Sequence, residues 1–101
     1  MSTIKVRVAL GESDNEFVEE AATKGKYPVR FLLKMLIEKY CEEYPGVTPS
    51  VSSSVPVAGH MVSLSSDVLN TIDQMSKDSS LPRESVLRAI VENRIDSLQE
   101  E

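Results

Sequence analysis

Hydrophobic and polar residues alternate along the first stretch of the chain, from Thr3 to Leu10. Successive side chains of a β-strand point to opposite faces, so this alternation predicts a strand with two different faces. The aliphatic face consists of Ile4, Val6, Val8 and Leu10, and the other face consists of Thr3, Lys5, Arg7 and Ala9. Such a strand needs a partner strand and a core, and we expect its basic face to make an external contact.

The spacing of apolar residues becomes helical after this strand. Ser13 and Glu16 have the spacing of a capping box, so we expect a helix to begin there, and Gly25 is placed to end it as a left-handed C-cap. Pro28 fits the first position of a second helix. The apolar residues of that helix cover most of its circumference: Phe31, Leu32, Leu33, Met35, Leu36, Ile37, Tyr40 and Cys41. It should therefore be buried on several sides, against another copy or a related helix.

A similar pattern follows residues 45–57, which contain three prolines, four serines and no charge and are predicted to form an extended linker. Residues 60–64 alternate again, Ser65 or Ser66 can cap a helix, and Pro82 opens another helix. The expected apolar positions are Val68, Leu69, Ile72 and Met75 in the first of these helices, and Val86, Leu87, Ile90, Val91, Ile95 and Leu98 in the second.

A shift of 54 positions superimposes the two patterns. It places Val8 on Val62, Leu10 on Leu64, Pro28 on Pro82, Leu33 on Leu87 and Glu38 on Glu92. The chain is therefore predicted to contain a strand-helix-helix unit twice. The first helices agree less well, because Val68 and Leu69 fall on Asp14 and Asn15. We expect that helix of the first unit to start later or to sit differently.

Composition narrows the function classes. The 101 residues, of which 41% are hydrophobic and 27% charged, suit one globular domain. No apolar run approaches membrane-spanning length and no signal-peptide pattern is present, so we expect a cytoplasmic protein. Cys41 is the only cysteine and fits a helical core position, and His60 is the only histidine, so no zinc cluster is expected. No nucleophile is paired with a recognisable base, so no enzyme activity, cofactor or small-molecule ligand is expected.

Charge is unevenly distributed along the chain. The net charge of −5 argues against a nonspecific polyanion binder, but the first ten residues carry Lys5 and Arg7 and no acidic residue. For these two cations the alternative is a solvated edge strand that charge protects from aggregation.

The second unit, HMVSLSSDVLNTIDQMSKDSSLPRESVLRAIVENRI, resembles the ribbon-helix-helix module of Arc-, MetJ- and CopG-type repressors. The resemblance covers Gly59 to about Leu98. Its carriers are the alternating strand ending at Leu64, the polar helix start Ser65-Ser66-Asp67 and the entry Pro82-Arg83-Glu84-Ser85. The first unit, IKVRVALGESDNEFVEEAATKGKYPVRFLLKMLIEKY, is similar, with a weaker first helix and a more typical basic strand.

The resemblance implies a mainly α fold with a short two-stranded antiparallel β-ribbon. Two tandem ribbon-helix-helix units, residues 1–44 and 58–101, would share one core as an intrachain pseudo-dimer joined by the linker 45–57. The linker makes their association intramolecular and so raises the effective concentration of one unit for the other. A dimer of chains remains the alternative.

The resemblance also implies roles for particular residues. The expected base-contacting residues are Thr3, Lys5 and Arg7 in the first strand and Met61 and Ser63 in the second. For the second strand the alternative is a purely structural role without contact to bases. Backbone N–H groups at the start of each second helix, at Val29 and Arg30 and again at Arg83 and Glu84, would hold phosphates. Lys26 and Arg83 would assist, whereas the Glu84 carboxylate would oppose a phosphate.

The resulting expectation is a sequence-specific DNA-binding regulator, a repressor associated with the nucleoid, whose partner is double-stranded DNA. Because the two strands differ, its site should be non-palindromic, with the stronger half contacted by the first strand. The alternative is a protein-binding module on the same scaffold, such as an antitoxin-like or assembly protein.

Overall fold

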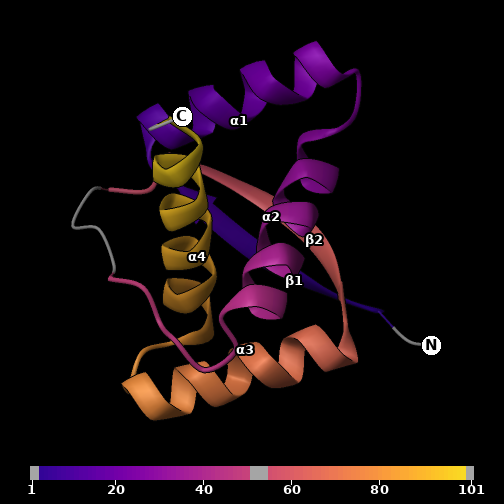
Figure 1. Cartoon of the computed structure of the whole chain (residues 1–101). Coiled ribbons are helices and arrows are strands. Elements are labelled where there is room, and N and C mark those ends of the chain that lie inside the picture. Colours follow the sequence, from indigo (N-terminus) through magenta and orange to yellow (C-terminus); the bar gives the residue numbers. More distant parts are fainter. Residues whose placement is uncertain (1–2, 51–54, 100–101) are drawn as a thin grey trace.

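The computed structural model of the chain describes residues 3–50 and 55–99. The elements follow one another as β1 (Thr3–Leu10), α1 (Glu12–Gly25), α2 (Val29–Glu43), β2 (Ala58–Ser65), α3 (Ser66–Ser79) and α4 (Arg83–Gln99). Figure 1 shows the ribbon of β1 and β2 behind α2 and α4, with α1 and α3 at opposite ends. The predicted combination of a mainly helical chain with a short two-stranded antiparallel sheet is confirmed.

The sheet forms within one chain, by antiparallel pairing of β1 with β2. Its register runs from Thr3 opposite Ser65 to Leu10 opposite Ala58, and it places Arg7 directly opposite Met61. Met61 is also the residue that lies 54 positions after Arg7. The pairing continues beyond the ribbon, because the Val57 N–H donates to the Leu10 carbonyl at 2.9 Å.

The aliphatic faces of both strands point into a core that includes residues of every helix. The buried strand residues are Val6, Val8, Leu10, Val62 and Leu64. They belong to one continuous cluster with apolar side chains from α1, α2, α3 and α4. Ile4, assigned to the same face by the alternation, is 48% exposed.

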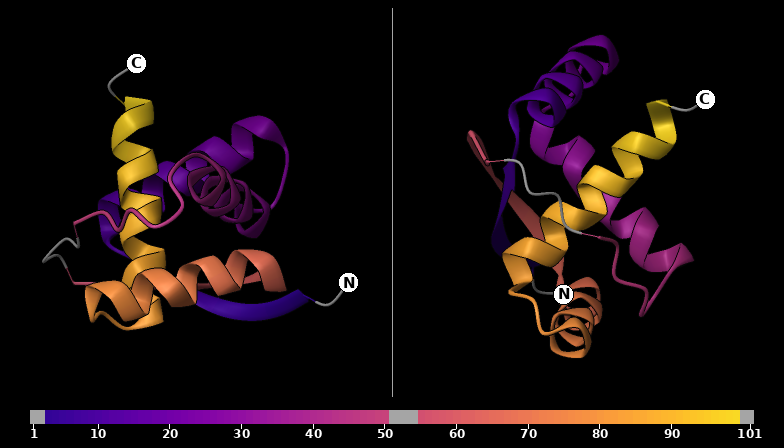
Figure 2. Two further views of the ribbon diagram at one scale, coloured as in Figure 1. Left: turned by 60° about the horizontal axis from the view of Figure 1, so that its bottom comes forward. Right: turned by 90° about the vertical axis from the view of Figure 1, so that its left-hand side faces the viewer.

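Helices α2 and α4 cross on the inner side of the ribbon and pack against each other (Figure 2). The expectation that α2 is buried against a related helix holds for Leu32, Leu33, Leu36, Ile37, Tyr40 and Cys41. It fails for Phe31 and Met35, which are 46% and 43% exposed and lie outside the buried core cluster. Leu98, predicted to be buried, is 42% exposed and lies one residue before the end of α4.

The helix bounds repeat at the same spacing of 54 residues. Helices α1 and α3 begin and end 54 positions apart, and α2 and α4 begin 54 positions apart. Lys26 and Ser80, which end the first helix of each half, both adopt a left-handed conformation with φ of 60°. The N–H of the following residue closes each turn, from Tyr27 to the Ala22 carbonyl and from Leu81 to the Ser76 carbonyl. Of the two expectations for α1, a later start than its counterpart is therefore wrong.

Two predicted caps of α1 are also wrong. The strand ends at Leu10, so α1 begins at Glu12 after a single connecting residue, Gly11, whose carbonyl accepts from the Asn15 N–H at 2.9 Å. Ser13 consequently lies inside the first turn and caps nothing. Gly25 is the last helical residue rather than the left-handed one, and it is needed because a Cβ there would lie 2.1 Å from the Tyr27 ring.

The other helix starts are close to expectation. Ser65 caps α3 as predicted, with its Oγ accepting a hydrogen bond from the Val68 N–H at 3.3 Å. Pro28 precedes α2 by one residue instead of opening it, and its carbonyl accepts from the Phe31 and Leu32 N–H groups. The linker has no helix or strand in its described part, and residues 51–54 lie outside the described residues.

Candidate nucleic-acid interface

The outer face of the ribbon brings the sequence-predicted base-contacting residues together. The right-hand view of Figure 2 shows the ribbon on one side of the molecule, with α2 and α4 on its other side. Pairing sets Thr3 opposite Ser65, Lys5 opposite Ser63 and Arg7 opposite Met61. Thr3, Lys5, Arg7 and Met61 are exposed, and Ser63 is partly exposed. The ribbon therefore presents two cations from β1 beside a thioether and a hydroxyl from β2.

Arg7 does not point straight out from its own position. A Cβ at Gly59 would lie 2.6 Å from Arg7 Nε and 3.0 Å from Nη2, so the guanidinium lies over the glycine of the neighbouring strand. Gly59 is diagonal to Arg7 in the ribbon, two pairs beyond Met61 and opposite Ala9. The missing side chain at Gly59 thus gives the Arg7 guanidinium a place on the exposed face.

The start of α2 lies beside β2. A hollow lies between them, lined by Ser63 of β2 and by four residues at the start of α2: Pro28, Arg30, Phe31 and Lys34. No carboxylate is among the described residues of this lining. The first N–H groups of a helix lack partners within the helix, and they carry the positive end of its dipole. The expected phosphate position at Val29 and Arg30 therefore has two cationic side chains around it, Arg30 and Lys34.

Two residues around this hollow differ from expectation. Lys34 was not predicted, although its spacing of four residues from Arg30 places both on one side of the helix. Lys26 is exposed at the left-handed turn before Pro28, and it is not among the residues that line the hollow. The side chain of Val29 packs against the core, so only its backbone N–H is available there.

The start of α4 lies beside β1. A second hollow here is lined by Lys5, Val6, Arg7, Pro82, Arg83, Glu84 and Leu87. Arg83 is bound to Asp73 of α3 by two hydrogen bonds, Nε to Oδ1 at 2.7 Å and Nη2 to Oδ2 at 3.0 Å. Nothing in the sequence had indicated Asp73, which lies ten positions before its partner. Both helix starts thus flank the ribbon, but with different charges.

His60 and Cys41 have structural positions. His60 Nε2 lies 2.7 Å from the Asn15 side-chain oxygen, which ties β2 to α1. Cys41 is buried in α2, and burial, followed by the nearby Glu38 charge, raises the pKa of its thiol to about 11. Within residues 3–50 and 55–99, no group of three or more His, Cys, Asp or Glu side chains is placed to hold a metal ion.

A cluster of charged groups joins α1 to α4. Arg88 Nε lies 3.3 Å from Glu92 Oε2, and both residues are 8% exposed. Asp14 of α1 lies against this pair. Burial, the Glu92 and Asp96 charges and a hydrogen bond with Glu92 raise the pKa of Asp14. The cluster therefore favours the protonated form of the Asp14 carboxyl.

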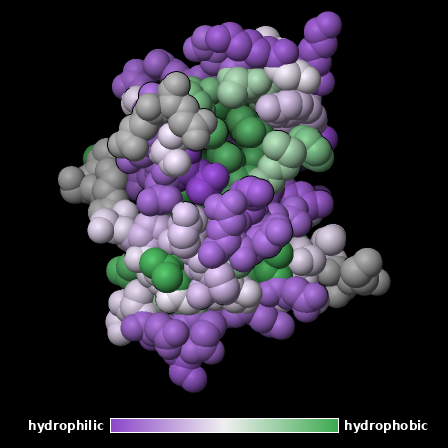
Figure 3. Space-filling view, viewed as in Figure 1, coloured by the Kyte–Doolittle hydropathy of each residue, from purple (hydrophilic) through white to green (hydrophobic). Residues whose placement is uncertain are grey.

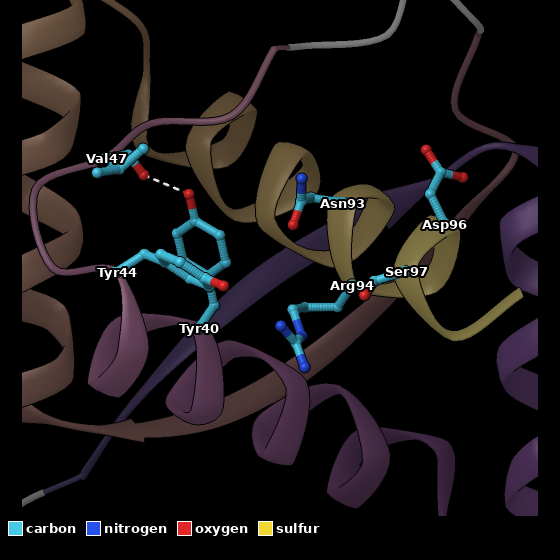
Figure 4. A pocket seen from close by; sticks show the side chains of 7 residues that line it. All are labelled: Tyr40, Tyr44, Val47, Asn93, Arg94, Asp96 and Ser97. Carbon is cyan, nitrogen blue, oxygen red and sulfur yellow. Dashed lines mark hydrogen bonds between the residues drawn. The ribbon is translucent and has the colours of Figure 1, made fainter. Parts of the chain in front are cut away.

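A further hollow of about 530 Å³ lies between the C-terminal parts of α2 and α4, on the side away from the ribbon (Figure 4). Tyr40 donates its hydroxyl proton to the Val47 carbonyl at the rim, and Arg94 Nη1 lies 3.5 Å from Glu43 Oε2. The rest of the lining is Tyr44, Asn93, Asp96 and Ser97. The sequence had given no sign of this hollow. Its lining includes a cation, Arg94, and an anion, Asp96, so its charge favours neither an anionic nor a cationic ligand.

The remaining surface adds little to the choice of a binding face. On the face seen in Figure 3 most residues are hydrophilic, and apolar side chains emerge in separate patches. None of the helices in the described part of the chain has an apolar stretch sufficient to traverse a lipid bilayer.

In comparisons with known proteins, no family model, no curated protein and no solved structure matches the chain. The function is therefore inferred from the ribbon and its two flanks.

Proposed function

We propose that this chain is a sequence-specific DNA-binding transcriptional regulator, a repressor, that inserts the β1/β2 ribbon into the major groove. The observation that carries this proposal is the exposed ribbon face with Lys5 and Arg7, flanked by the starts of α2 and α4. The major groove admits a two-stranded ribbon and displays a distinct pattern of donors and acceptors for each base pair. Helix starts on either side of a ribbon are suited to hold the phosphates that border the groove.

The proposal includes the finer fold assignment, a tandem ribbon-helix-helix pseudo-dimer. The helix bounds at a spacing of 54 residues support it, as does the shared apolar cluster. The register adds further support, because a pseudo-twofold axis relating residues 54 positions apart would pass through the Arg7–Met61 pair. Multi-angle light scattering should give the mass of one chain. A mass of two chains would mean either that the halves are exchanged between chains or that two pseudo-dimers dock side by side.

The ribbon residues have different capacities for reading bases. Arg7 has the guanidinium that can bind guanine bidentately, and Lys5 can reach guanine or a phosphate. Met61 can contact a thymine methyl, and the Ser63 hydroxyl can donate or accept. Because charge lies on β1 alone, the bound site should be non-palindromic.

Selection of double-stranded DNA from a random pool, using the full chain, tests the proposal. We expect an enriched non-palindromic site whose affinity falls with added salt. Lys5→Ala should weaken binding to the selected site. Lys39→Ala should not, because Lys39 is an exposed cation in the C-terminal half of α2 that pairs with Glu43 and is not part of the ribbon. Absence of affinity for any DNA at low salt would refute the proposal, and a palindromic site would favour ribbons formed between two chains.

A second function, a protein-binding module, is favoured by one observation. Phe31 and Met35 lie one turn apart on α2, and both are more than two-fifths exposed. The positions 54 residues later on α4 hold Ser85 and the fully buried Ala89. If selection yields no DNA, affinity capture of partners by the wild-type chain and by a Phe31→Ser/Met35→Ser variant tests this function. A partner retained equally by both would argue against that surface.

A further inference from the structure

The start of α4 differs from the start of α2 because its cationic side chain, Arg83, is already paired with a carboxylate. The Asp73 carboxylate binds the Nε and Nη2 edge of the Arg83 guanidinium through two short hydrogen bonds. The two side chains are 44% and 46% exposed, so the pair lies at the surface and not in the core. It joins α3 to the first residue of α4.

This pair changes the charge beside the ribbon. Arg83 and Glu84 line the same hollow as Lys5 and Arg7. With Asp73 bound, the positive charge of Arg83 is balanced, and Glu84 leaves the α4 start with one uncompensated negative charge. The corresponding hollow at α2 has Arg30 and Lys34 and no carboxylate among its described lining residues. The α4 flank, where Lys5 and Arg7 of the ribbon are the remaining cations, is therefore less positive than the α2 flank, and it should attract a phosphate less strongly.

Asp73 could in principle act in the opposite direction, by orienting Arg83 so that its free Nη1 meets a phosphate. The exposure of the pair argues against this role. An exposed ion pair is stabilised only weakly, so it holds the Arg83 side chain in place only weakly. Prior orientation by Asp73 would therefore lower the entropic cost of phosphate binding by little. The negative charge of Asp73, in contrast, acts on any phosphate near Arg83.

We propose that Asp73 keeps Arg83 from binding the DNA backbone, so that the protein binds DNA mainly through β1 and the start of α2 and only weakly through the start of α4. This inference rests on the proposed function. Asp73 is thus a residue that limits affinity without contacting a base. The consequence is a complex in which one border of the groove is held more firmly than the other.

Binding of the selected DNA by the full chain across a series of salt concentrations tests this inference. Asp73→Asn should tighten binding about 3- to 10-fold. It should also steepen the slope of log K against log salt by about 0.9, because one more phosphate is neutralised. Arg83→Ala should bind somewhat more weakly than the wild type, because it leaves the Asp73 charge without its partner, and the double variant should lose the gain seen in Asp73→Asn.

The matched control is Asp78→Asn, on the same helix. Asp78→Asn changes the net charge by the same amount as Asp73→Asn. It removes no arginine partner, because the Asp78 carboxylate accepts a hydrogen bond from Gln74 and contacts no arginine in the described structure. An equal gain from Asp78→Asn would overturn the inference, because the effect would then come from net charge alone. Weaker binding by Asp73→Asn would also overturn it, since Asp73 would then be orienting Arg83 toward the phosphate.

The two proposals fail in different ways. If the wild-type chain binds DNA and Asp73→Asn binds with the same affinity and salt slope, only the role of Asp73 is refuted. If the wild-type chain binds no DNA, the proposed function itself is refuted, and the inference with it. Circular dichroism and thermal melting of each variant establish that it is folded before binding is compared.

Discussion

The first half of the chain, β1–α1–α2, and the second, β2–α3–α4, place their helices 54 residues apart but carry different charges around the ribbon. Inside, the halves are alike. Paired positions that are fully buried in both include Val8 and Val62, Leu10 and Leu64, Val18 and Ile72, Leu33 and Leu87, and Ile37 and Val91. Close packing permits little change at such positions.

On the surface the halves have diverged. The register and the repeat both relate Arg7 to Met61, and the start of α2 has Val29 and Arg30 where α4 has Arg83 and Glu84. Exposed positions tolerate substitution with little loss of stability. Two halves with the same spacing of helices can therefore keep one core while they differ in surface charge.

The largest effects should come from the shared core. Leu33→Ala and Leu87→Ala each remove a fully buried side chain, and each should lower the free energy of unfolding by about 2–5 kcal/mol. Urea denaturation followed by circular dichroism should show one transition for both variants. Two separate transitions, or a loss confined to one variant, would mean that the halves fold independently.

On the DNA side, Arg7→Ala should weaken binding to the selected site by about 1–3 kcal/mol if the guanidinium reads a guanine. Met61→Ala, at the paired position, should weaken it by less than about 1 kcal/mol, since only an apolar contact is lost. Fluorescence anisotropy at fixed salt gives both values. Equal losses would contradict the assignment of the stronger half to β1.

The helix starts offer a smaller contrast. Ser65→Ala removes the cap of α3 and should lower the free energy of unfolding by about 0.5–1 kcal/mol. Ser13→Ala should change it by less than about 0.5 kcal/mol, because Ser13 lies inside the first turn of α1. Thermal melting of the two variants measures the difference. A larger loss for Ser13→Ala would restore the capping box to α1.

The smallest expected effect is a pH-dependent one at Asp14. Its raised pKa means that the folded state favours the protonated carboxyl, so this contribution is present below about pH 4 and is lost as pH rises through the folded pKa. Asp14→Asn should therefore raise the melting temperature slightly at pH 7, because it removes the burial of a carboxylate beside the Glu92 and Asp96 charges.

The gain from Asp14→Asn should shrink as the pH falls to about 3, where the Asp14 carboxyl of the wild type is mostly protonated whether folded or unfolded. Glu16→Gln, an exposed change on the same helix, is the control and should show no such pH-dependent gain. Destabilisation by Asp14→Asn at neutral pH would contradict the charge assignment of the α1–α4 cluster.

Local sequence was sufficient for most of the elements. Alternation over Thr3–Leu10 predicted β1 at its observed bounds, and the spacing of the leucines and isoleucines predicted α2 and α4. These signals are local, because a strand or a helix repeats over a few residues. The α1 start was predicted wrongly because the capping-box spacing competes with the end of β1, which leaves only Gly11 as a connection.

Part of the interface could likewise be read from the sequence. Period-two alternation is enough to place Lys5 and Arg7 on the outer face, and the proline at position 28 is enough to place Arg30 near a helix start. Lys34 was missed because a cation on a helix surface has no distinguishing pattern until the neighbouring strand is known.

The sequence by itself determined the two strand-helix-helix runs, their apolar stripes and the basic face of β1, all of which depend on neighbours within a few residues. Only the tertiary structure decided that the Arg7 guanidinium lies over Gly59, that Asp73 binds Arg83, and that Phe31 and Met35 stay exposed. Each of these depends on the register of the ribbon or on the crossing of helices. Such contacts join residues from different elements, and the pattern along one element does not specify what packs against it.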